Sequence, residues 1–247
     1  MIESGDILIL LTGTFTGMLI GLVGIGGVLL LPILISTTNL EIHRIIPASS
    51  FSFFFTGMAA TFMYRKFGWV RLRTSKHLVY GIIPGAIGGA LVNPYVSDLI
   101  LIYLFSVLLL LTGIRSLVGA KDQIESQDEN KTLFLMVGVL VGFCSSLTGT
   151  AGPVMLIPTL MLFHHGLKQI IGLSQVIQIP IAVVASITYL LTTGVDLKLG
   201  LMLGFSQAAG VLVGALLARK INTVILKRIT SLLLILSGLL LISKEWI

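Results

Sequence analysis

Residues 7 to 36 read ILILLTGTFTGMLIGLVGIGGVLLLPILIS and carry no charged side chain. A bilayer core needs about 20 residues of helix, so this run is longer than one straight span requires. Three glycines stand within Gly24-Ile25-Gly26-Gly27, and each costs a helix about 1 kcal/mol relative to alanine. A break at membrane depth is tolerated only where protein or a water-filled cavity surrounds it. The stretch therefore predicts two helical pieces that meet at a broken tip.

A second stretch of the same kind occupies residues 133 to 163, LFLMVGVLVGFCSSLTGTAGPVMLIPTLMLF. Its break falls near Gly152-Pro153, and a proline is well placed in the first turn of a returning helix. Discontinuous helices that build a binding site near the bilayer midplane are typical of transporters. Two such elements in one chain therefore indicate a transporter.

The composition places the chain in a membrane. Hydrophobic residues make up 55% of the sequence and charged residues 11%, whereas a soluble domain carries about 25% charged residues. The net charge of +6 comes from basic residues in short connections between apolar runs, which is typical of cytoplasmic membrane loops. We therefore expect an all-α, multi-pass protein of the cell membrane, with the lipid bilayer and not nucleic acid as its surroundings.

The remaining apolar runs and the two broken elements form two series of four segments. The runs cover residues 45–64, with Pro47 in the first turn, and then residues 78–92, 99–114, 170–191, 199–218 and 229–242. Shifting the chain by 125 residues pairs Gly13 with Gly138, Ser49 with Ser174 and Gly85 with Gly210. An internal duplication explains ordered matches of this kind. We predict a repeat in residues 1–119, a charged cytoplasmic linker in 120–130 and a second repeat in 131–247.

The distribution of basic residues predicts how the repeats are oriented. Clusters at residues 65–76 and 219–228 should both face the cytoplasm. If all eight segments crossed, the 16 Lys and Arg residues would divide 10 to 6; if each broken element returned to its own side, they would divide 13 to 3. The second division predicts inverted repeats with re-entrant first elements. Both termini should then lie outside and the linker inside.

The breaks also suggest the chemistry of a binding site. Returning helices that begin near Gly26-Gly27 and Gly152-Pro153 would direct unpaired N–H groups toward the centre, which suits a small anion. Amides and hydroxyls deep in the runs would add donors; Ser174 and Gln178 are four residues apart, on one helical face. The alternative is that these side chains only hold helices together. The candidate substrate-binding residues are Gly24, Gly26, Gly27, Ser49, Ser50, Thr150, Gly152, Ser174, Gln175, Gln178 and Gln207.

The remaining glycines, and the residue types and motifs that the sequence lacks, limit the possible functions further. For Gly13, Gly17 and Gly21, and for Gly81, Gly85 and Gly89, close helix packing is the preferred interpretation. No Asp, Glu, Lys or Arg lies deep in a run, which disfavours a proton pump. No catalytic or nucleotide-binding motif is present, so we expect no enzyme activity and no cofactor. The His164-His165 pair is interpreted as solvated, with no metal site.

The segments GLVGIGGVLLLPIL and SSLTGTAGPVMLIPTL, within two four-segment halves, resemble the TauE/SafE family of sulfite and organosulfonate exporters. The resemblance covers essentially the whole chain. It implies an inner-membrane exporter of small sulfur-containing anions whose site is lined by Gly24, Gly26, Gly27, Thr150 and Gly152. Pro153 departs from the pattern, because glycine is usual there. An anion channel, a transporter of another small anion and a membrane-embedded enzyme or assembly factor remain alternatives, as do a monomer and a homodimer.

Overall fold

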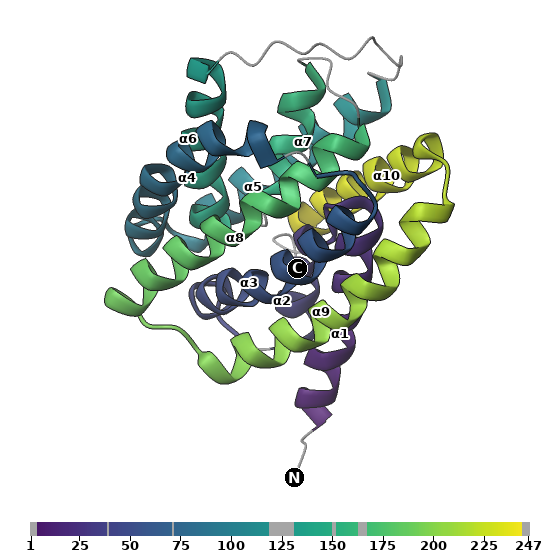
Figure 1. The fold of residues 1–247 in the computed structure, drawn as a ribbon. Coiled ribbons are helices and arrows are strands. Elements are labelled where there is room, and N and C mark those ends of the chain that lie inside the picture. Colours follow the sequence, from purple (N-terminus) through teal and green to yellow (C-terminus); the bar gives the residue numbers. More distant parts are fainter. Residues whose placement is uncertain are drawn as a thin grey trace.

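The computed structural model describes residues 4–38, 40–70, 72–118, 131–149, 152–162 and 167–243, and their regular secondary structure is entirely helical. Figure 1 shows the helices gathered into one bundle. Each predicted segment corresponds to a helix, so the all-α prediction is confirmed. In chain order the elements are α1 (Ser4–Val23), η1 (Gly26–Leu29), α2 (Leu30–Thr37), α3 (Ile42–Lys66), α4 (Leu72–Val92), η2 (Asn93–Tyr95), α5 (Asp98–Val118), α6 (Lys131–Thr148), α7 (Pro153–Leu162), α8 (Leu167–Leu191), α9 (Leu197–Lys220) and α10 (Thr223–Ser243).

The outer surface of the bundle suits a lipid environment. Among the described residues, six helices are long and apolar enough to cross a bilayer: α1, α3, α4, α6, α8 and α9. Large apolar side chains are widely exposed on these helices, including Leu191 at 81% and Phe205 at 63%. Exposed apolar surface on this scale would favour aggregation in water. The protein is therefore a multi-pass membrane protein.

Both predicted breaks are present, and each is made at a glycine in the left-handed region. The φ angle is +84° at Gly24 and +63° at Gly149, a conformation that glycine adopts without the penalty of a Cβ atom. After the first break the chain folds back on α1, since a Cβ atom at Gly26 would lie 2.4 Å from the Thr16 carbonyl oxygen. The first arm, α1, has 20 residues and is long enough to span, whereas the returning α2 has 8.

Glycines allow close packing in two helix pairs, as the sequence predicted. In both pairs the helices are parallel. A Cβ atom at Gly17 of α1 would lie 2.1 Å from the Gln207 carbonyl oxygen of α9, and one at Gly21 would lie 2.2 Å from that of Val211. The positions advance together, so α1 and α9 run in the same direction. The α4–α6 pair is built in the same way, with Gly81 against Leu135, Gly85 against Val139 and Gly89 against Phe143.

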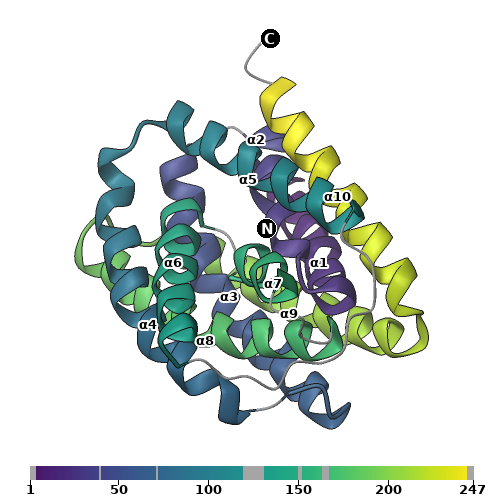
Figure 2. The same cartoon turned by 90° about the horizontal axis from the view of Figure 1, so that it is seen from above.

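The remaining contacts fix the relative directions of the other helices. Gly200 and Gly204 of α9 pack on Phe51 and Phe55 of α3, so α3 runs parallel to α9. The α3 and α8 helices are antiparallel, because Gly57 lies against Ile179 whereas Trp69, just beyond the end of α3, lies against Gly172. Along α5 and α10 the contacting positions also run in opposite orders, with Gly113 near Ile235 and Gly238 near Leu110. Figure 2 shows this last pair crossing at one side of the bundle.

Two ion pairs place the starts of three helices on one face. Lys198 Nζ lies 3.2 Å from Asp6 Oδ1, and Arg44 Nη2 lies 2.6 Å from Asp196 Oδ2. Partial burial raises the pKa of Asp196, but the Leu199 N–H and Arg44 outweigh it and hold the pKa below its usual value. The α1, α3 and α9 helices therefore begin on the same face of the bundle.

The start of α3 differs from the prediction. The helix begins at Ile42, with Glu41 as its N-cap residue, and the backbone N–H groups of Arg44 and Ile45 donate to the Glu41 carbonyl oxygen. Pro47 therefore lies in the second turn and not in the first. An apolar run marks only the part of a helix inside the hydrocarbon layer. The first turn is polar and carries Arg44, so the apolar run could not predict it.

Candidate functional site

The polar centre of the bundle lies where α3 and α8 cross. Gln178 Nε2 donates to Thr56 Oγ1 at 2.7 Å, near the middle of each 25-residue helix. Gly57 permits the close crossing, since a Cβ atom there would lie 3.0 Å from Ile179 Cγ1. Thr56 is fully buried and Gln178 is 1% exposed. Buried polar groups are normally hydrogen-bonded, and this bond joins the two helices at mid-depth.

Each break is bound by a helix from the other half of the chain. Gln175 Nε2 of α8 donates to the Gly24 carbonyl oxygen at 3.2 Å, and Ser49 Oγ of α3 lies 3.3 Å from the Gly149 carbonyl oxygen. A chain reversal leaves backbone carbonyls without helical partners, and such groups are costly when buried. The Gln175 amide satisfies the carbonyl at the first break, and the Ser49 hydroxyl, which also lies 2.9 Å from the Ile46 carbonyl oxygen, contacts the carbonyl at the second. Both breaks are thereby connected to the α3–α8 crossing.

Gln207 extends the polar centre to α9 and α1. Its Oε1 atom lies 2.9 Å from Ser52 Oγ, and its Nε2 atom lies 3.4 Å from Thr16 Oγ1. Gln207, Ser52 and Thr16 are all fully buried. Protein groups engage both ends of this amide, so Gln207 joins three helices.

The start of each returning helix reaches this polar centre. Gly26, the first residue of η1, packs on Thr16, whose hydroxyl contacts Gln207. A Cβ atom at Gly152 would lie 2.5 Å from Ile181 Cδ1 and 3.3 Å from Ile177 Cδ1, so the start of α7 packs on α8. The first N–H groups of a helix have no acceptor within it, and no side chain caps η1.

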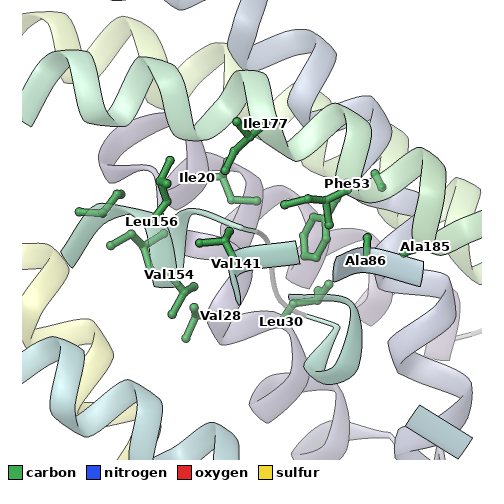
Figure 3. Close-up of a cluster of buried hydrophobic side chains, with 14 of the residues drawn as sticks. Ile20, Val28, Leu30, Phe53, Ala86, Val141, Val154, Leu156, Ile177 and Ala185 are labelled. Carbon is green, nitrogen blue, oxygen red and sulfur yellow. The ribbon is translucent and has the colours of Figure 1, made fainter. Parts of the chain in front are cut away.

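Apolar side chains enclose the polar centre. Val28 of η1 and Val154 of α7 belong to one buried cluster with Ile20, Phe53 and Ile177, and Figure 3 shows these side chains converging from different helices. A low-polarity surround strengthens hydrogen bonds to a buried ligand. The polar atoms of the centre are amides, hydroxyls and backbone groups, without a formal charge.

The sequence-predicted residues are placed as follows. Gly24, Gly26, Gly152, Ser49, Gln175, Gln178 and Gln207 are brought together around the α3–α8 crossing. Gly27 is buried within η1, Ser50 is 4% exposed on α3, and Ser174 Oγ donates to the Ile171 carbonyl oxygen of its own helix. Thr150 lies outside the described residues, as do His164, His165 and the linker at 120–130.

Gln175 and Gln178 were expected to donate hydrogen bonds to an anion, but in the structure their donor groups are already bonded to the protein. Gln175 Nε2 and Gln178 Nε2 both have protein acceptors, whereas Gln175 Oε1 and Gln178 Oε1 have no protein partner. The groups that remain available on α8 therefore include two acceptors.

Sequence reasoning missed several contributors to the centre. Thr16, Ser52 and Thr56 lie in apolar runs as single hydroxyls, which usually bond to their own helix. Two buried tyrosines were also missed: Tyr64 donates to the Gly21 carbonyl oxygen and Tyr189 to that of Ser146. Tyr189 lies 125 residues after Tyr64, and Ser146 lies 125 residues after Gly21. That spacing was a signal available in the sequence.

The described residues contain no group of three or more His, Cys, Asp or Glu that could hold a metal ion. A multi-pass helical protein in which two glycine breaks reach a buried polar centre has the construction of a membrane transporter.

Comparison with known proteins supports that class. The chain belongs to the "Sulfite exporter TauE/SafE" family, whose model matches residues 8–241. It is similar to the probable membrane transporter protein YdhB of Bacillus subtilis, with 24% identity over 243 residues, which is 95% of this chain and 99% of that protein. It is also similar to the probable membrane transporter protein MJ0441 of Methanocaldococcus jannaschii, with 24% identity over 197 residues, or 76% of this chain and 73% of that protein. No solved structure matches significantly.

Proposed function

We propose that the protein exports small sulfur-containing anions, such as sulfite or an organosulfonate, through alternating access of two inverted repeats. The repeats would comprise residues 1–119 and 131–247, and the anion would bind at the polar centre between the two breaks. The observation that carries the proposal is the convergence of both breaks on the buried, uncharged polar groups of α3 and α8.

The helix directions support the inverted arrangement. The α1 and α3 helices run parallel to α9, whereas α3 runs opposite to α8. In the predicted repeat α8 corresponds to α3 and α9 to α4. Each break is contacted from the other half, Gly24 by Gln175 and Gly149 by Ser49. The two donors occupy neighbouring and not equivalent positions of the repeat, but the reciprocal pattern supports two halves related by a two-fold axis in the membrane plane.

The chemistry of the centre supports a small anionic substrate. A helix start carries about half a positive charge. That field stabilises an anion without a buried basic side chain, which would itself be costly to place at the bilayer centre. The choice of sulfur-containing anions follows the description of the family.

Transport by purified protein in proteoliposomes tests this proposal. We expect saturable sulfite flux that is accelerated by sulfite on the opposite side. The acceleration arises because a transporter with substrate bound changes from one open side to the other faster than an empty one. Non-saturable flux without this acceleration would indicate an anion channel. The absence of flux for sulfite and for simple sulfonates would overturn the proposal.

A further inference from the structure

Two buried amide oxygens on successive turns of α8 lack any protein partner: Gln175 Oε1 and Gln178 Oε1. The residues are 0% and 1% exposed, respectively. Their positions are three apart, so they share one side of the helix. Buried polar atoms without partners are few in folded proteins and each calls for an explanation.

Hydrogen-bond chemistry fixes which end of each amide is unpaired. Thr56 Oγ1 lies 3.0 Å from the Phe53 carbonyl oxygen, to which it donates its own hydrogen. It can therefore only accept from Gln178, which requires the Gln178 nitrogen at this contact. Gln175 faces the Gly24 carbonyl oxygen, which is also an acceptor only. In both residues the oxygen is consequently the free end.

A third buried glutamine differs in degree. Gln207 Oε1 lies 2.9 Å from Ser52 Oγ, although that hydroxyl also lies 2.7 Å from the Ser49 carbonyl oxygen and has a single hydrogen to share. Gln175 Oε1 and Gln178 Oε1 have no protein hydrogen-bond partner at all.

A carboxamide oxygen accepts hydrogen bonds and repels the oxygens of an anion. We infer that the substrate of the proposed anion site carries an O–H or N–H donor beside its anionic group, and that Gln175 Oε1 and Gln178 Oε1 accept from that donor. This inference rests on the proposed function. The anionic group would face the helix starts, of which α7 begins beside Ile177 and Ile181, the neighbours of Gln178 along α8.

The inference identifies a class of substrate. Hydrogensulfite, hydroxysulfonates and aminosulfonates carry both features. Sulfate, fully deprotonated sulfite and simple alkanesulfonates lack the donor. A site built to hydrogen-bond a donor discriminates strongly against an analogue without it, because its own polar groups are then left unpaired.

Hydroxymethanesulfonate and ethanesulfonate form a suitable ligand pair, since they differ by an O–H in place of a methyl group. We expect the natural protein to bind hydroxymethanesulfonate about tenfold or more tightly than ethanesulfonate, as measured by calorimetry in detergent. Gln178→Leu should reduce this ratio to near one. Thr188→Val, which removes a hydroxyl that bonds to the Val184 carbonyl oxygen of the same helix away from the polar centre, should preserve the ratio.

Equal affinity of the natural protein for the two sulfonates would overturn the inference while leaving the proposed anion site intact. A ratio that persists in both Gln175→Leu and Gln178→Leu would also overturn it. If neither sulfonate nor sulfite binds, the proposed function fails and this inference fails with it.

Discussion

In the proposed repeat the α3 and α8 helices occupy corresponding places in the two halves of the chain, but they carry different polar groups. Ser49 corresponds to Ser174, Ser50 to Gln175 and Phe53 to Gln178 across the 125-residue spacing. The α3 positions supply small hydroxyls and a buried core phenylalanine, whereas the α8 positions supply two long amides. Each helix binds a carbonyl at the opposite break, but only α8 retains unpaired amide oxygens.

If the repeat is correct, this difference separates two tasks that the corresponding helices would perform. Holding the breaks requires contacts from each half, and Ser49 and Gln175 provide them. Contacting a substrate requires polar atoms that the fold leaves free, and in the proposed site the α8 amides would supply these. We therefore expect the C-terminal half to dominate substrate recognition, and the following predictions test that asymmetry.

The largest effect concerns the inversion on which the comparison rests. With Cys144 replaced by serine, single cysteines at Ser4 and Ser243 should be labelled by an impermeant reagent from outside, and one at Ser126 only from inside. The 13 to 3 division of Lys and Arg requires this arrangement. Labelling of Ser4 and Ser243 from opposite sides would contradict inverted repeats.

The second effect concerns charge at the start of α7. A carboxylate at Gly152 would lie about 4 Å from a bound anion, and at an effective dielectric near 20 the repulsion is about 4 kcal/mol. Gly152→Asp should therefore abolish transport. Gly152→Ala is the control for bulk, because its Cβ atom meets the mobile ends of Ile181 and Ile177. Near-normal flux through a correctly inserted Gly152→Asp variant would argue against an anion site there.

A smaller effect distinguishes the two breaks. Alanine in the left-handed region costs about 1–2 kcal/mol, so Gly24→Ala and Gly149→Ala should both lower the melting temperature. Gly149→Ala should lower it more, because its Cβ atom would lie 3.0 Å from the Ile46 Cα atom, which belongs to the backbone. The Gly24 position meets the end of a side chain, Ile157 Cδ1, at 3.3 Å. The opposite order in thermal unfolding would show that the breaks are held differently.

Much of this architecture could be predicted because membrane burial makes sequence patterns simple. The clustered glycines at Gly24 and Gly152 marked the breaks, and the apolar runs marked the helices. The orientation derived from the basic residues stays a prediction. Partners far apart in sequence could not be predicted. Gln175 and Gly24 are 151 positions apart, and which amide end is engaged depends on the packing of helices. The first turn of α3 was also missed, since its polar residues lie outside the hydrocarbon layer.

The most direct test of the asymmetry compares Gln175→Ala with Ser49→Ala, measuring sulfite affinity and melting temperature on the same purified proteins. Each variant loses one hydrogen bond to a break carbonyl, so both should lose about 1 kcal/mol of stability. Only Gln175→Ala also removes a proposed substrate contact, and its affinity for sulfite should fall about tenfold while that of Ser49→Ala changes little. Equal losses of affinity, or a greater loss in Ser49→Ala, would contradict a substrate site carried by α8.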